Sequence, residues 1–102
     1  MQLAEVLDEF RLTFKYLYFG NLCYAKNETS KAIEWFTEAT KRLPDNSCPI
    51  WCLAEVYEKK GQWYLADKCF HKAVDVNPND SEAVKKLEDW LDRNELTFKP
   101  QS

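Results

Sequence analysis

The chain has 102 residues, of which 45% are hydrophobic and 30% charged, with two Gly, four Pro and a formal net charge of -3. This length supports one hydrophobic core, and this composition excludes a disordered tail, a collagen-like chain and a low-complexity linker. The acidic balance, with basic residues scattered singly or in pairs, argues against nucleic acid as a partner, because phosphate neutralisation supplies most of the affinity for it.

The first predicted helix contains neither Gly nor Pro from Met1 to Phe19. Its apolar residues recur every three or four positions, which is the pattern of one helical face. These residues are Leu3, Val6, Leu7, Phe10, Phe14 and Leu17. Asn27 tolerates the left-handed conformation that often closes a helix, so we expect the helix to end before it.

Four more helices are predicted, three of them with candidate capping residues at their starts and three with Pro44, Gly61 or Pro78 after their ends. We place them at about residues 31–43, 48–60, 64–76 and 81–93. The expected caps are Thr29 or Ser30 for the second helix, Ser47 for the third, and Asp80 or Ser81 for the fifth. Because no segment shows sustained two-residue alternation, the sequence predicts an all-α fold.

The helices repeat at a fixed spacing along the sequence. Shifting the chain by 34 brings Ala32 onto Ala66, Phe36 onto Phe70, Ala39 onto Ala73 and Pro44 onto Pro78. Gly20 falls on Ala54, and both are small residues that allow helices to approach closely. The recurring residues are therefore those expected at helix contacts.

This pattern resembles the tetratricopeptide repeat (TPR), a helix–turn–helix unit with small residues at its eighth, twentieth and twenty-seventh positions. The resemblance implies an all-α TPR helix–turn–helix solenoid with an N-terminal helical extension. Its parts are the extension at 1–12, a first repeat at 13–46, a second repeat at 47–80, a terminal capping helix (half repeat) at 81–95 and a tail at 96–102. The extension either lengthens the first helix or forms a separate one, and its stripe either covers the open front of the stack or mediates self-association.

A TPR stack presents a concave groove formed by the first helix of each repeat. The resemblance places in it Phe14, Leu17, Tyr18, Asn21, Trp51, Cys52, Glu55, Lys85 and Lys86. We therefore expect a non-catalytic protein-interaction or scaffold module that binds an apolar partner segment, with Lys85 and Lys86 available to an acidic flank. Two alternatives are that the chain's own extension or tail fills the groove, and that the chain is a structural assembly piece, either a homodimer or a fragment of a longer TPR protein.

One TPR subtype grips heat-shock-protein carboxylates with a clamp of Lys, Asn, Asn, Lys and Arg. The corresponding residues here are Leu17, Asn21, Cys52, Glu82 and Lys86. Only Asn21 matches in type, and Lys86 keeps only the charge. Because carboxylate recognition needs converging donors, we do not expect this activity.

The candidates for catalysis and metal binding are few. His71, the only histidine, follows the expected core residue Phe70 and is predicted to lie toward the flank of its helix. Cys48 and Cys52 share a helical face, but Cys69 and His71 point apart, so a four-ligand zinc site is hard to assemble. We expect no catalysis, no metal and no cofactor.

The chain is predicted to be cytoplasmic, or alternatively nuclear, with reduced cysteines. No apolar run approaches the ~20 residues that span a bilayer, so no membrane association is expected, and the acidic N-terminus lacks the layout of a signal peptide. Among the tryptophans, we expect Trp35 and Trp63 to pack between repeats. Leu87 and Leu91 suffice to bury the terminal helix, so Trp90 is predicted to lie at its edge.

Overall fold

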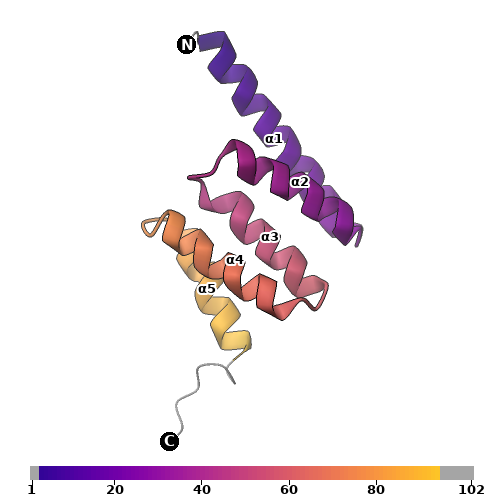
Figure 1. Cartoon of the computed structure of the whole chain (residues 1–102), viewed down its shortest axis with the longest axis vertical. Coiled ribbons are helices and arrows are strands. Elements are labelled where there is room, and N and C mark those ends of the chain that lie inside the picture. The colour runs from indigo at the N-terminus through magenta and orange to yellow at the C-terminus, as the bar shows by residue number, and fades with distance from the viewer. Residues whose placement is uncertain (1–2, 95–102) are drawn as a thin grey trace, which may run out of the picture.

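The computed structural model describes residues 3–94, apart from the side chains of residues 6, 9 and 10 (Figure 1). It contains five helices, which are α1 (Leu3–Ala25), α2 (Thr29–Arg42), α3 (Ser47–Lys59), α4 (Trp63–Val76) and α5 (Ser81–Arg93). Within this range there is no strand, which confirms the all-α prediction. The predicted tail at 96–102 and the side chains of Val6 and Phe10 lie outside the described residues.

α1 is one continuous helix that includes the predicted extension from Leu3 onward. It has 23 residues against 14 in α2, which at 1.5 Å per residue is about 34 Å against 21 Å. The N-terminal part of α1 therefore projects beyond the other helices (Figure 1). Of the two forms expected for the extension, the structure shows the lengthened first helix.

The turns lie where Asn27 and Gly61 predicted them, but the capping residues of two helices differ from the prediction. Asn27 has a φ of 64° and Gly61 a φ of 79°, so each closes a helix in the left-handed conformation. α2 begins after Glu28, which makes no side-chain cap bond, so the predicted Thr29 or Ser30 cap is wrong. The cap of α3 is Asn46 rather than Ser47, because the Asn46 side chain is the one that accepts from the backbone N–H of Cys48.

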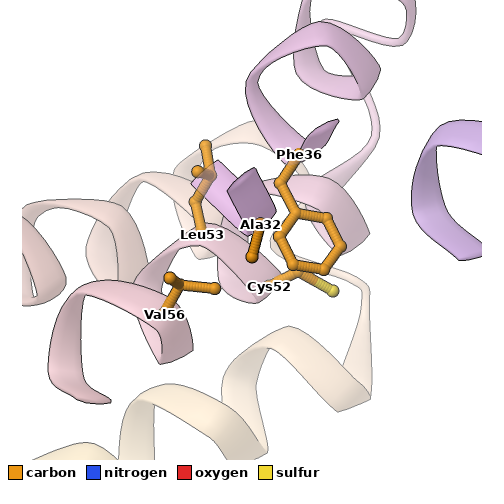
Figure 2. Close-up of a cluster of buried hydrophobic side chains, with 5 residues drawn as sticks. All are labelled: Ala32, Phe36, Cys52, Leu53 and Val56. Carbon is orange, nitrogen blue, oxygen red and sulfur yellow. The ribbon is translucent and has the colours of Figure 1, made fainter. Parts of the chain in front are cut away.

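Each helix packs against the next along the chain, and α3 also contacts α5. One core cluster joins Ala32 and Phe36 of α2 to residues of α3, namely Cys52, Leu53 and Val56 (Figure 2). A second joins Ala66 and Phe70 of α4 to Ala54 and Trp90, and a third joins Ile50, Ala73 and Ala83. The three pairs related by the sequence repeat, Ala32 and Ala66, Phe36 and Phe70, and Ala39 and Ala73, are all at most 1% exposed. The sequence repeat thus recurs as a repeat of buried positions.

Gly20 sets the distance between α1 and α2. A Cβ atom added at this residue would lie 2.5 Å from Cε1 of Phe36, well inside van der Waals contact. The ring of Phe36 therefore occupies the space that any larger residue would need. The prediction that a small residue permits close helix approach here is confirmed.

Gly20→Ala should lower the free energy of unfolding by about 1 to 3 kcal/mol, because the new methyl group overpacks against a ring that is almost fully buried. Urea unfolding followed by circular dichroism measures this change. Gly61→Asn is the control, since an added Cβ meets nothing within 4 Å there and Asn tolerates a positive φ. Equal midpoints for Gly20→Ala and wild type would contradict the close approach.

Asp80 joins the start of α5 to the start of α3. Its carboxylate accepts hydrogen bonds from the Ser47 hydroxyl and from the backbone N–H of Glu82, as the predicted cap of α5. The bond from Ser47, supported by those from the backbone, lowers the pKa of Asp80 against the opposing effect of burial. Ser47 itself is buried, so it links two helices rather than capping one.

Asp80→Ala should cost about 1 to 2 kcal/mol of stability at neutral pH, as expected for the loss of a helix cap. Because the pKa of Asp80 is lowered in the folded state, its stabilisation is complete above the unfolded pKa of about 3.9 and fades as the pH falls through the folded value. The difference between wild type and variant should therefore shrink on acidification, measured by urea unfolding at a series of pH values. Asp80→Asn, which keeps an acceptor, should lose less at neutral pH, and a difference for Asp80→Ala that stayed constant to pH 3 would contradict this account.

Candidate interaction surface

The clearest surface feature is a row of large apolar side chains exposed along α1. Their exposed fractions are 74% for Leu3, 48% for Leu7, 59% for Phe14, 64% for Tyr18 and 39% for Leu22. At 3.6 residues per turn they fall within an arc of about 100°. We call these five residues the α1 apolar face.

The opposite side of α1 packs on α2. Thr13 and Gly20 are buried there, and Tyr16 and Phe19 lie 5.6 and 5.2 Å from Trp35, measured between ring centroids. The ring of Tyr16 also lies 5.1 Å from the guanidinium of Arg42. α1 therefore has one apolar side inside the molecule and a second one at its surface.

The structure divides the predicted groove residues of α1. Phe14, Tyr18 and Asn21 are exposed, as a binding surface requires. Leu17 is partly buried and packs against the core cluster around Phe36. Leu3 and Leu7 are exposed on the projecting part of α1, so within one copy they do not cover the front of the stack, which was one of the two roles considered for the extension.

On α3 the predicted groove residues belong largely to the core. Cys52 is 5% exposed and lies against Ala32 and Phe36, so its assignment to the groove is wrong (Figure 2). The cause is α2, which covers this side of α3. The Cys52 thiol donates a hydrogen bond to Cys48, and this bond together with burial raises the pKa of Cys52.

Trp51 is half-buried and contacts all three core clusters. Its Nε1 atom is buried and has no hydrogen-bond partner within the described part of the chain. The ammonium of Lys86 lies 4.7 Å from the centroid of the ring, a cation–π distance. Trp51 thus serves mainly to hold the helices together.

Lys86 and Glu55 bind each other across the α3–α5 contact. Lys86 Nζ lies 2.8 Å from Glu55 Oε2, and both side chains are less than a third exposed. Burial works against the charged form of Lys86, but the hydrogen bond and negative charge of Glu55 outweigh it and raise the pKa of Lys86. Lys86 is therefore paired within the chain, whereas the sequence analysis had offered it to an acidic partner. Lys85 is exposed and lies 3.7 Å from Asp89.

A network of polar contacts, not anticipated from the sequence, continues beside this pair. Arg93 donates two hydrogen bonds of 2.8 Å to the carboxylate of Glu58. Lys59 donates to the backbone carbonyl of Tyr24 at 2.8 Å, and its ammonium lies 4.1 Å from the Tyr24 ring centroid. These contacts link α1, α3 and α5 across the region where the groove was predicted. No sequence motif indicated them, because the partners of each bond lie 35 residues apart.

The tryptophan predictions need correction. Trp90 is 3% exposed, stacks on Phe70 at 5.2 Å and donates from Nε1 to Asp67 at 2.8 Å, so it lies in the core and not at an edge. The prediction failed because it assigned the contact to Leu87 and Leu91 alone, whereas both pack only partly buried and Trp90 is the α5 residue that stacks on Phe70. Trp35 packs between α1 and α2, within the first predicted repeat rather than between repeats. Trp63 is 57% exposed, but its ring lies 6.2 Å from that of Trp90 between centroids, across the predicted repeat boundary as expected.

The candidates for catalysis and metal binding do not form a site within the described residues. His71 is partly exposed, and its Nδ1 lies 2.9 Å from the backbone oxygen of Asp67. Over residues 3–94, no three His, Cys, Asp or Glu side chains come together in a way that would hold a metal ion. None of the helices described there is long and apolar enough to cross a membrane.

Comparison with known proteins gives no identification. The sequence matches no family model and no curated protein. The surface must therefore be interpreted from its own geometry, in which the α1 apolar face is exposed and most of the predicted α3 and α5 residues are engaged within the chain.

The pair of Glu55 and Lys86 should contribute a coupling energy of about 1 kcal/mol, because it is partly buried and well aligned. A double-mutant cycle of Glu55→Ala and Lys86→Ala, followed by urea unfolding, measures it. Lys85→Ala is the control and should change stability by less than about 0.5 kcal/mol, as usual for a surface residue. Additive effects of Glu55→Ala and Lys86→Ala would contradict the role given to the pair.

Proposed function

We propose that this chain is a non-catalytic protein-interaction module of the TPR type, which binds a partner helix on the α1 apolar face. The observation that carries the proposal is the exposure of five large apolar side chains along one face of a single helix. Large apolar side chains gathered on one exposed face are uncommon on monomers and usually mark an interaction site. Tyr18 and Phe14 are also of the aromatic class that often anchors interfaces.

The assignment to the TPR type is supported by agreement between the sequence repeat and the burial pattern. Ala, Phe and Ala recur at the same relative positions in α2 and α4, and each of these residues is buried. Helices follow one another with short turns, as in a stack of helix–turn–helix units. The proposed role is that of a scaffold, without catalysis or a cofactor, and it is supported by the exposed apolar surface of α1.

The internal repeat also indicates which kind of partner fits. The same shift of about 34 residues along the sequence that relates α2 to α4 also brings Tyr18 onto Cys52 and Leu22 onto Val56. In α3 both of these residues are buried in the cluster that contains Ala32 and Phe36 of α2. The exposed side of α1 is thus equivalent to a side that a helix covers in α3, so a helix is the expected ligand.

We place the chain in the cytoplasm, with the nucleus as the alternative. All four cysteines are free thiols, and the most buried of them, Cys52, packs in the core as a thiol. Reduced, structurally inert cysteines are typical of those compartments. The carboxylate-clamp activity of heat-shock co-chaperones is not part of the proposal, because Leu17 packs partly buried against the core, Cys52 lies in the core and Lys86 is bound to Glu55.

The test is a selection of amphipathic helical peptides on the immobilised protein, followed by fluorescence anisotropy with individual variants. Tyr18→Lys should weaken binding of the selected peptides by about tenfold or more, because it removes an aromatic anchor worth at least about 1.4 kcal/mol. Tyr64→Lys is the matched control, since Tyr64 is 73% exposed but lies on α4. Peptides that bind equally well to wild type and to Tyr18→Lys would contradict the proposed site.

A further inference from the structure

The α1 apolar face has an internal symmetry that identifies one partner. We propose that it binds the same face of a second copy of this chain, with the two α1 helices antiparallel and the two-fold axis between Leu12 and Thr13. This inference rests on the proposed function, because it names the helix that covers the proposed site. It goes further in specifying an isologous dimer with a defined register.

The spacing of the residues in the row is the same in both directions along α1. With Arg11 included, the exposed positions are 3, 7, 11, 14, 18 and 22, separated by four, four, three, four and four residues. An antiparallel pair about the stated axis places Leu3 opposite Leu22 of the second copy and Leu7 opposite Tyr18. A two-fold interface requires such self-complementarity, because one patch must serve both sides.

The charges at and beside the row fit this register. Arg11 faces Phe14 of the second copy, where a guanidinium meets an aromatic ring. Asp8 and Lys15 are exposed on one flank of the row, two turns apart. In the antiparallel pair, Asp8 of each copy lies within about one turn of Lys15 of the other. The dimer therefore gains two pairs of opposite charge. The parallel alternative would place like residues side by side.

The second copy would supply what the stack lacks at its front. In α3 the positions equivalent to Tyr18 and Leu22 are covered by α2, which runs antiparallel to α3 because a short turn joins them. In the proposed dimer, the second copy's α1 likewise runs antiparallel to the α1 helix that it covers. Its projecting N-terminal part, with Leu3 and Leu7, would cover Tyr18 and Leu22 as α2 covers Cys52 and Val56. The projection of α1 beyond α2 is explained by this exchange (Figure 1).

The area available is that of a small specific dimer. At roughly 200 Å² for a fully exposed large apolar residue, the exposed fractions of the five side chains correspond to about 550 Å² per copy. The flanking charged residues add to this, so that the total over both copies reaches the low end of the range of about 1,200 to 2,000 Å² for specific interfaces. We therefore expect a dimer in the micromolar range rather than an obligate one.

Light scattering coupled to size exclusion tests the oligomeric state over a range of loading concentrations. The full chain should approach twice its mass of 12.1 kDa at high concentration. Leu7→Glu and Tyr18→Glu should each remain at the monomer mass while keeping the wild-type circular dichroism spectrum, because both side chains are exposed in the monomer. Tyr64→Glu is the control and should dimerise as wild type does.

A charge exchange tests the register without altering the apolar residues. Asp8→Lys and Lys15→Asp should each weaken the dimer by about tenfold, since each creates two like-charge pairs, and the double variant should restore it. Analytical ultracentrifugation measures these dissociation constants. Two weakened single variants with no recovery in the double variant would overturn the register.

The remaining outcomes separate this inference from the proposed function. A monomer at every concentration would overturn the dimer, and if Tyr18→Lys still weakened binding of helical peptides, the proposed function would stand with another protein as partner. A dimer that survives Leu7→Glu and Tyr18→Glu would overturn the inference, because it would form through another surface. A monomer whose peptide binding ignores Tyr18 would overturn both proposals.

Discussion

The ring of Phe36, held between Gly20 of α1 and the buried face of α3, is the contact on which the remaining structure depends. Only a residue without a side chain lets α1 approach this ring, and the same ring forms the core cluster with Cys52 and Val56 (Figure 2). Three helices are therefore positioned by one side chain. Phe70 repeats the arrangement one unit later, with Ala54 in the place of Gly20.

A stack built from such contacts has two ends, and this chain treats them differently. At the C-terminal end, α5 places Trp90 over Phe70 and fixes it through the bond to Asp67, so that the last core cluster is closed. At the N-terminal end, α1 turns its second apolar side outward, and Tyr18 and Leu22 stay exposed. The asymmetry arises because α5 packs against the helix before it, α4, whereas no helix precedes α1 among the described residues. The exposed apolar side chains of the protein are therefore available for binding at its front, on α1.

The groove expected between the first helices of the repeats is occupied by contacts within the chain. Lys86 pairs with Glu55 and covers Trp51, and Arg93 binds Glu58. Each of these charged side chains is stabilised by its partner across the α3–α5 contact. A ligand that bound one of them would have to replace that partner. The apolar part of the predicted site on α1 stays exposed because no described helix lies opposite it.

The sequence by itself determined the helices and their spacing. Local structure is defined by the apolar periodicity, by Asn27 and Gly61, and by Pro44 and Pro78 after two of the helices. The sequence is enough to predict it because local structure depends on neighbours in the chain. It also determined the buried residues that recur from α2 to α4, because small and aromatic residues repeated at this spacing are typical of helix contacts. Only the tertiary structure decided the direction of each remaining side: that Cys52 and Trp90 face inward, that Lys86 meets Glu55, and that Tyr18 faces outward. The physical reason is that a residue's burial depends on which helix lies opposite it, and that helix is either distant in the sequence, as Lys86 is from Glu55, or absent from the described chain.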